Sequence, residues 1–265
     1  MTTAVKTLTH SEYIHHHMQN WQLNLHSMSY GNGGFWTLDL DTLLISLLLG
    51  IGFLWLFYAA AKKATSGVPG KWQNVVEMAV SGVEKITRDS THMDQRFIAS
   101  MALTVFVWVF LMNFMDLVPL DLVPVIMHAF GAPYFRAVPT ADPAMTFALS
   151  IVVFLLILYY NVKAKGALSL TKEVLSKPFG WWGLPVNLAF RIIEEVVKPI
   201  SLSLRLFGNL FAGEIVFILV ALLPWWMQFP LGFVWTVFHL LVIVIQAFIF
   251  MMLTIVYLGL AQESH

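Results

Sequence analysis

The stretch Ser201–Glu214, SLSLRLFGNLFAGE, decides the fold because it places an arginine within an apolar segment long enough to cross a bilayer. Arg205 stands roughly midway along that segment. A bare guanidinium at the bilayer centre costs about 2.5–3.5 kcal/mol even on lenient insertion scales. No acid shares its helix face within two turns. The pattern therefore predicts a cation kept for function rather than for packing.

The helical periodicity of this stretch separates two surfaces. At about 100° per residue, four small or polar side chains fall within about 60° of Arg205: Ser201, Gly208, Asn209 and Ala212. Small side chains let the backbone of another helix approach closely. Glu214 points to the opposite side. We expect a partner helix on the Arg205 face and a neighbour within the chain near Glu214.

The composition is that of an integral membrane protein. Of 265 residues, 58% are hydrophobic and only 11% are charged, whereas soluble domains carry about 25% charged residues. The 15 basic and 15 acidic residues cancel, so no nucleic acid is expected as a partner. The chain has no cysteine. Neighbouring histidines such as His15 and His16 cannot all face one ion, so we expect a solvated tail, no metal and no cofactor.

Five apolar segments are long enough to cross a core of ~30 Å at ~1.5 Å per residue: residues 42–61, 97–115, 144–161, 185–223 and 231–261. Residues 71–88 alternate with a helical period and predict an amphipathic helix at the membrane surface. The last two spans are overlong, so they should form a tilted antiparallel hairpin around a turn at 224–230. The predicted fold is an all-α membrane protein with a segment 1–40 and a membrane domain 41–265.

Basic residues alternate between the loops and predict the orientation. The first 40 residues contain one, the loop after the first span contains six, and the turn at 224–230 contains none. This places the N-terminus outside the cell and, after five spans, the C-terminus in the cytoplasm.

Polar residues of the last two spans match in depth. In a hairpin that turns near residue 226, Glu214 lies opposite His239, and Arg205 lies opposite Gln246 about 13 Å deeper. Glutamate and histidine exchange protons near neutral pH when their surroundings shift them, whereas arginine keeps its proton. The pattern indicates proton traffic with Arg205 as a barrier that attracts a carboxylate on a partner.

Structural interpretations stay open for several of these residues. The Glu214–His239 pair also fits a packing role, and Asn209 and Gln246 also fit simple hydrogen bonds between helices. Four charges of the outer loops are interpreted as solvated: Asp116, Asp121, Arg136 and Asp142.

The residues SLRLFGN at 203–209, AGE at 212–214, His239 and QAF at 246–248 closely resemble the subunit a family of bacterial F-type ATP synthases. The likeness covers nearly the whole chain. It includes AKKATSGVPGK at 61–71, VFVWVFLMNFMDLVPLDLVP at 105–124 and LTIVYL at 253–258.

The resemblance implies a non-catalytic, proton-conducting stator in the F0 sector, located in the bacterial inner membrane with its N-terminus in the periplasm. Arg205 would face the carboxylate of each passing c-ring subunit and separate two offset half-channels. Four residues would belong to the periplasmic half-channel: Glu214, His239, Asn209 and Gln246. Asp116 and Asp142 resemble polar residues at its entrance. The implied partners are the c-ring, the b subunits of the peripheral stalk, the F1 sector through the stalks, and membrane lipid.

One departure concerns the cytoplasmic side. The family carries an acid where this chain has Arg191, and Glu194 and Glu195 follow about one turn later. Glu195 is therefore the candidate for the cytoplasmic exit.

Two other functional classes fit the sequence less well. A secondary transporter with its substrate at Arg205 would show paired repeats and broken helices at the midplane, and neither is visible in the sequence. An intramembrane enzyme would need a catalytic motif, and the chain has no HExxH or GxxxxGK[ST] sequence. ATP chemistry is therefore expected in another chain.

Overall fold

A computed structural model of the chain describes residues 20–30, 36–65, 67–90, 95–118, 122–123, 135–166 and 180–262. Its six α-helices are α2 (Leu40–Lys62), α3 (Lys71–Ser90), α4 (Gln95–Phe114), α6 (Pro143–Lys165), α8 (Leu184–Ala221) and α9 (Trp225–Gln262). Three short 3-10 helices are η1 (Met115–Leu117), η2 (Pro139–Ala141) and η3 (Trp181–Gly183). Five helices are long and apolar enough to cross a membrane, and α3 is the more polar sixth. The predicted fold class is confirmed.

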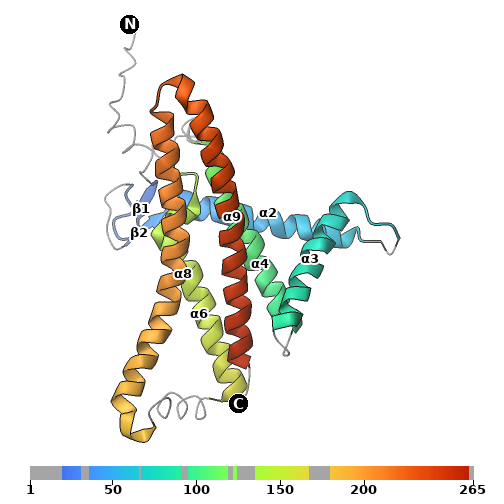
Figure 1. Cartoon of the computed structure of the whole chain (residues 1–265), viewed down its shortest axis with the longest axis vertical. Coiled ribbons are helices and arrows are strands. Elements are labelled where there is room, and N and C mark those ends of the chain that lie inside the picture. Colours follow the sequence, from blue (N-terminus) through green and yellow to red (C-terminus); the bar gives the residue numbers. More distant parts are fainter. Residues whose placement is uncertain are drawn as a thin grey trace.

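The two longest helices, α8 and α9, form the predicted antiparallel hairpin (Figure 1). The turn is shorter than predicted, since α9 already begins at Trp225. The carbonyl of Pro224 accepts hydrogen bonds from the backbone N–H groups of Met227 and Gln228, which start the helix. The Gln228 side chain then donates to the carbonyls of Ala221 and Leu223, at 2.9 and 2.7 Å. Carbonyls at the end of α8, which lack helical partners, are thereby satisfied.

The hairpin and α2 run in different directions. Figure 1 shows α2 lying crosswise to α8 and α9, so these helices cannot all stand along the membrane normal. A helix of 38 residues is ~57 Å long at ~1.5 Å per residue, about twice the hydrocarbon core. A helix of this length must tilt in the bilayer or extend beyond the hydrocarbon.

The core lies among α4, α6, α8 and α9, where apolar side chains are fully buried, for example Met112, Leu206 and Phe250. Helix α2 joins this core through α4. Trp108 of α4 donates its indole N–H to the carbonyl of Ser46 at 2.9 Å, and its ring lies beside Gly50.

The segment before α2 forms two short strands that the sequence analysis did not predict. β1 (Gln22–Asn24) pairs antiparallel with β2 (Thr37–Asp39). Asp41, in the first turn of α2, accepts the backbone N–H of Trp21 at 3.0 Å. The histidines at 10 and 15–17, the glycines at 31, 33 and 34, and Asp121 lie outside the described residues.

Candidate functional site: buried charges at one end of the helical hairpin

Helix α8 presents the two surfaces expected from its periodicity. The five residues of the Arg205 face are all exposed: Ser201, Arg205, Gly208, Asn209 and Ala212. A Cβ atom placed on Gly208 would meet nothing within 4 Å. The opposite side of the helix is buried, with Leu206, Leu210 and Glu214 facing the bundle. Arg205 therefore lies on an open, shallow face of the isolated chain.

Glu214 pairs with Arg136, which lies three residues before the start of the short helix η2 at Pro139. The Arg136 Nε donates to both carboxylate oxygens of Glu214, at 3.1 and 3.2 Å, and one terminal guanidinium nitrogen donates to Oε2. The two residues are only 7% and 3% exposed. The interpretation of Arg136 as a solvated loop charge is wrong. A buried carboxylate needs a charged partner, and the guanidinium fork matches its two oxygens.

His239 has a different acidic neighbour from the one predicted. Its Nε2 lies 2.5 Å from Oδ2 of Asp116, and both residues are buried. Asp116 reaches α9 because the chain tightens into η1 directly after α4 ends at Phe114. The predicted Glu214–His239 pair is thus replaced by two contacts, Glu214 with Arg136 and His239 with Asp116, and the interpretation of Asp116 as a solvated loop charge is also wrong.

The imidazole of His239 occupies the space beside Gly213. A Cβ atom at position 213 would lie 2.1 Å from Cε1 of the ring. The ring also stacks on Trp235, with centroids 6.0 Å apart, and meets Phe217 edge to face. Only glycine at 213 leaves room for this imidazole, and the contact fixes the depth of α9 against α8 close to the predicted register.

Gln246 pairs with Asn209 rather than with Arg205. The amide Nδ2 of Asn209 donates to Oε1 of Gln246 at 2.9 Å. The predicted Arg205–Gln246 level is therefore displaced by one helical turn along α8. The hydrogen bond sits between the level of Glu214 and the level of Arg205, and its Asn209 side lies on the exposed face of α8.

Asp142 is buried at the start of α6, where its side chain accepts the backbone N–H of Ala144 at 2.9 Å. Its interpretation as a solvated loop charge is wrong as well. Burial raises the pKa of this carboxyl to about 6, and the neighbouring Asp39 carboxyl adds to the rise. The Ala144 N–H opposes it.

Asp41 and Arg136 are the members of this site that sequence reasoning missed or misplaced. The Asp41 carboxylate accepts backbone N–H groups from Trp21, Thr42 and Arg136, at 3.0, 2.8 and 3.0 Å. One carboxylate thus ties β1 and the segment before η2 to α2. The sequence offers one signal for this role of Asp41, an acid in the first turn of an apolar helix. That signal is equally explained by the favourable interaction of an acid with the helix dipole.

Glu195, the candidate for the cytoplasmic exit, lies between two cations on α8. Its Oε1 is 2.8 Å from a guanidinium nitrogen of Arg191 and 3.3 Å from Nζ of Lys198. Lys198 also contacts Glu194 at 2.8 Å and lies 5.8 Å from the ring centre of Tyr257. The cluster is partly exposed and far along α8 from the Glu214 level.

Within the part of the chain that the structure describes, no group of three or more histidine, aspartate or glutamate residues is placed to hold a metal ion. The arrangement instead defines a class: a multi-pass helical membrane protein with buried polar contacts at one end of its helical bundle and Arg205 on an open helix face.

Comparisons with known proteins extend this class to a family. The model of the ATP synthase A chain family matches residues 43–259. The chain is 63% identical over 262 residues to ATP synthase subunit a of Coxiella burnetii (strain CbuK_Q154), covering 99% of both chains. It is 52% identical over 273 residues to ATP synthase subunit a of Shewanella sp. (strain W3-18-1), covering 100% of both. The chain belongs to the ATP synthase A chain family, and this membership supports a role in proton transport and ATP synthesis within the F0 sector.

The Arg136–Glu214 pair gives a prediction on stability. Arg136→Met removes the bidentate partner of a buried carboxylate and should destabilise the fold by about 3–5 kcal/mol. The double variant Arg136→Met with Glu214→Met removes both charges at similar volume and should be more stable than Arg136→Met alone. The midpoints of thermal unfolding in detergent measure both. Additive losses from the two single substitutions would contradict a coupled pair.

Two glycines of α8 offer a matched pair of variants. Gly213→Ala forces the methyl group against the His239 ring, so we expect a loss of about 1–3 kcal/mol from overpacking. Gly208→Ala enters open space and should leave stability equal or slightly higher, because alanine favours helix. Thermal unfolding of the full chain in detergent separates them, and equal midpoints for both variants would contradict the His239 placement.

The raised pKa of Asp142 predicts how stability depends on pH. The folded protein binds this proton more tightly than the unfolded chain, since the pKa rises from 3.8 to about 6 on folding. Raising the pH through that window should therefore remove on the order of 3 kcal/mol of stability. Asp142→Asn still caps the helix but does not titrate, so its unfolding midpoint should fall less over the same window. Parallel pH profiles of the two proteins would refute the buried proton.

Proposed function

We propose that this chain is the proton-conducting stator subunit of the F0 sector, in which Arg205 separates two offset half-channels that serve the carboxylates of a c-ring. The observation that carries the proposal is the open face of α8. A guanidinium stands there among small side chains, in a helix apolar enough to span the membrane. Its high cost in hydrocarbon is offset if a carboxylate of a partner helix comes to it.

The first half-channel would enter at the end of the bundle where the buried charges gather. Asp142 and Asp116 lie in segments at this end, and the Glu214–Arg136 pair and His239 follow at the depth of Gly213. The Asn209–Gln246 hydrogen bond then leads to the exposed face that carries Arg205. Acids and imidazole in this order supply groups that accept and release protons.

Buried polar atoms without a protein partner support a wet path at the same end. Among the described residues they include both side-chain atoms of Asn113, the hydroxyl of Thr140 and the indole nitrogen of Trp235. Buried polar groups are rarely left without a hydrogen bond. Water bonded to these atoms would satisfy them and continue the path between the ion pairs.

Arg205 would act as the barrier between the half-channels. Its guanidinium cannot be deprotonated, so it does not relay protons, and its charge repels a proton that approaches directly. A c-ring carboxyl arriving from one side would lose its proton near Arg205, pair with the guanidinium as it passes, and take up a proton from the other half-channel. The small residues around Arg205 allow the close approach that this requires.

The second half-channel would leave on the cytoplasmic side, with Glu195 as the candidate acid. Arg191 and Lys198 lie beside this carboxylate, at 2.8 and 3.3 Å. Such a carboxylate, still partly exposed at 17%, would receive protons released from the c-ring and pass them to water.

This role implies an orientation in the membrane and a set of partner subunits. The N-terminal segment 1–40 would lie in the periplasm and the C-terminus in the cytoplasm, with the membrane domain 41–265 in the bacterial inner membrane. The c-ring would cover the Arg205 face, and the b subunits of the peripheral stalk would link the chain to F1, where ATP chemistry takes place.

The alternative, a secondary transporter, would use helices broken at the midplane. Helices α8 and α9 run without interruption through their middle, which favours the stator.

The test of the barrier is Arg205→Ala. We expect ATP-driven proton pumping in inverted membrane vesicles to be abolished while the complex stays assembled, because the c-ring carboxylate loses its counter-charge. Ser201→Ala, on the same exposed face but without a charge, is the control and should pump nearly as the wild type does. Fluorescence quenching of a pH-sensitive dye measures pumping, and wild-type rates in Arg205→Ala would refute the barrier.

A further inference from the structure

The first part of α8, on the side of the proposed cytoplasmic exit, turns charged side chains inward and apolar ones outward. The side chains of Glu195 and Lys198 are only 17% and 27% exposed, while Val196 and Val197 between them are exposed. A surface helix of a protein in water shows the reverse arrangement. Charged side chains within membrane spans face the interior of the bundle or a wet cavity. This part of α8 therefore has a polar inner side.

One aromatic ring of α9 meets that polar side. The ammonium nitrogen of Lys198 lies 5.8 Å from the ring centre of Tyr257, within the ~6 Å at which the face of an aromatic ring attracts a cation. Tyr257 is half-buried and packs against the core, so its neighbours hold the ring in place. Helices α8 and α9 lie apart at the ends far from their turn (Figure 1). The two long side chains therefore connect the helices where their backbones have separated.

The ammonium group of Lys198 also lies between two carboxylates that differ in exposure. Its Nζ is 2.8 Å from Oε1 of Glu194 and 3.3 Å from Oε1 of Glu195. The Glu194 side chain is 53% exposed, and an exposed ion pair contributes little stability. Because lysine carries its charge on a flexible stem, its ammonium group could follow Glu194 outward. The contact with Tyr257 favours the inner position, beside Glu195.

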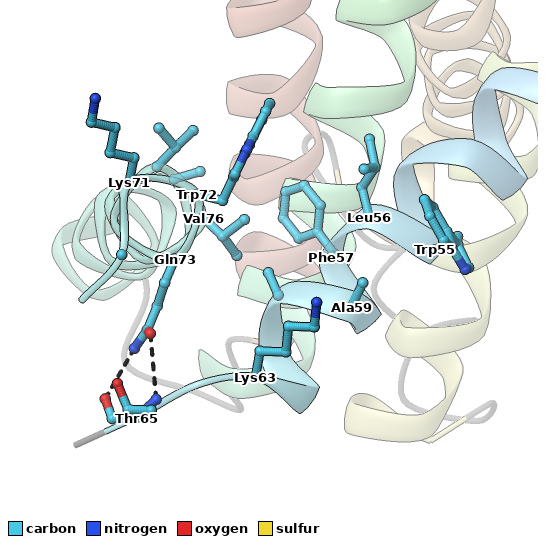
Figure 2. Close-up of a pocket in the computed structure, with 14 residues that line it drawn as sticks. Trp55, Leu56, Phe57, Ala59, Lys63, Thr65, Lys71, Trp72, Gln73 and Val76 are labelled. Carbon is cyan, nitrogen blue, oxygen red and sulfur yellow. Dashed lines mark hydrogen bonds between the residues drawn. The ribbon is translucent and has the colours of Figure 1, made fainter. Parts of the chain in front are cut away.

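Other lysines at the ends of spans lack this combination of a ring on another helix and two acids. Lys63, at the end of α2, extends toward the space between α2 and α3 (Figure 2), and none of the described residues that line this space is acidic. Lys163 lies 5.7 Å from the ring centre of Tyr160, but both residues belong to α6. Lys198 is therefore distinguished by a contact that links α9 to an acid of α8.

We propose that Tyr257 is a positioning residue of the cytoplasmic exit, which acts through Lys198 to keep the carboxylate of Glu195 in the space between α8 and α9. This inference rests on the proposed role of Glu195. Glu195 precedes Arg205 by about 15 Å along α8 at ~1.5 Å per residue, so a proton released near Arg205 needs a fixed acceptor at the end of a path through water. A carboxylate that moved outward with Lys198 would leave that path.

Substitutions of Tyr257 and Lys198 in the assembled complex test the positioning role by ATP-driven proton pumping in inverted vesicles. Tyr257→Phe keeps the ring and should pump nearly as the wild type does. Tyr257→Leu removes the ring and should lower the initial rate about fivefold, the factor that corresponds to a cation–π contact of ~1 kcal/mol. Lys198→Arg keeps a cation for the ring and should also pump nearly normally, whereas Lys198→Met should lose as much as Tyr257→Leu.

Tyr160→Leu is the matched control for the loss of a tyrosine ring. Tyr160 is half-buried, packs against the same core and has a lysine at nearly the same distance, but no residue of the proposed proton path lies beside it. This variant should pump at nearly the wild-type rate. Equal losses in Tyr160→Leu and Tyr257→Leu would overturn the inference, because lost packing would then explain both. An equal loss in Tyr257→Phe and Tyr257→Leu would overturn it as well, since the hydroxyl would then be the functional group.

The inference and the proposed function fail in different ways. If Glu195→Gln lowers pumping but Tyr257→Leu does not, the positioning role is wrong while the role of Glu195 stands. Wild-type pumping by Glu195→Gln would overturn both, and the barrier is tested separately by Arg205→Ala. The double variant Tyr257→Leu with Lys198→Met should pump no more slowly than the slower single variant, because the ring acts through the lysine. Additive losses would contradict that route.

Discussion

The buried ion pair between Arg136 and Glu214 is the constraint on which the outer end of the molecule depends. Arg136 belongs to the segment before η2, and Glu214 belongs to α8, so their bidentate contact fixes the loop against the hairpin. The backbone N–H of Arg136 bonds Asp41 as well, which brings α2 into the same assembly. Removing one partner of such a pair leaves a charge in a medium where charge is costly. The loop is therefore part of the bundle rather than a cover over it.

Arg136 and Arg205 each place a charge in apolar surroundings, and the two residues differ in where a partner for that charge can lie. Arg136 is buried and has its carboxylate within the chain, so it contributes to structure. Arg205 is exposed on an apolar helix, and its face carries small side chains instead of acids. Arg136 thus stabilises the fold through a partner in the same chain, whereas under the proposed function the partner of Arg205 is a carboxylate of another molecule.

The helices and their faces were predictable because they rest on local periodicity. The apolar lengths gave five spans, and the 3.6-residue period placed Glu214 and Arg205 on opposite sides of α8. The ion pairs were not predictable, because they depend on where irregular segments such as η1 and η2 bring Asp116 and Arg136. The course of an irregular segment has no sequence periodicity from which it could be predicted. At Gln246 the predicted partner was off by one turn, since Asn209 rather than Arg205 bonds it, while the Gly213–His239 contact lies close to the predicted depth.

The strands before α2 and the role of Asp41 were missed for a related reason. Three-residue strands carry too little alternation to stand out, and an acid at a helix start has an ordinary explanation. The roles of the site residues in proton transfer stay proposals, supported by their order between the outer loop and Arg205.

The crosswise position of α2 has a mechanical meaning. Parallel helices resist a lateral displacement mainly through the packing contacts between their side chains. Helix α2 instead runs across the hairpin (Figure 1) and is joined to α4 through the hydrogen bond from Trp108 to Ser46. A lateral force on the hairpin is then taken up along the axis of α2, the direction in which a helix is stiffest. In the proposed stator, the first span would therefore help to hold the Arg205 face in place.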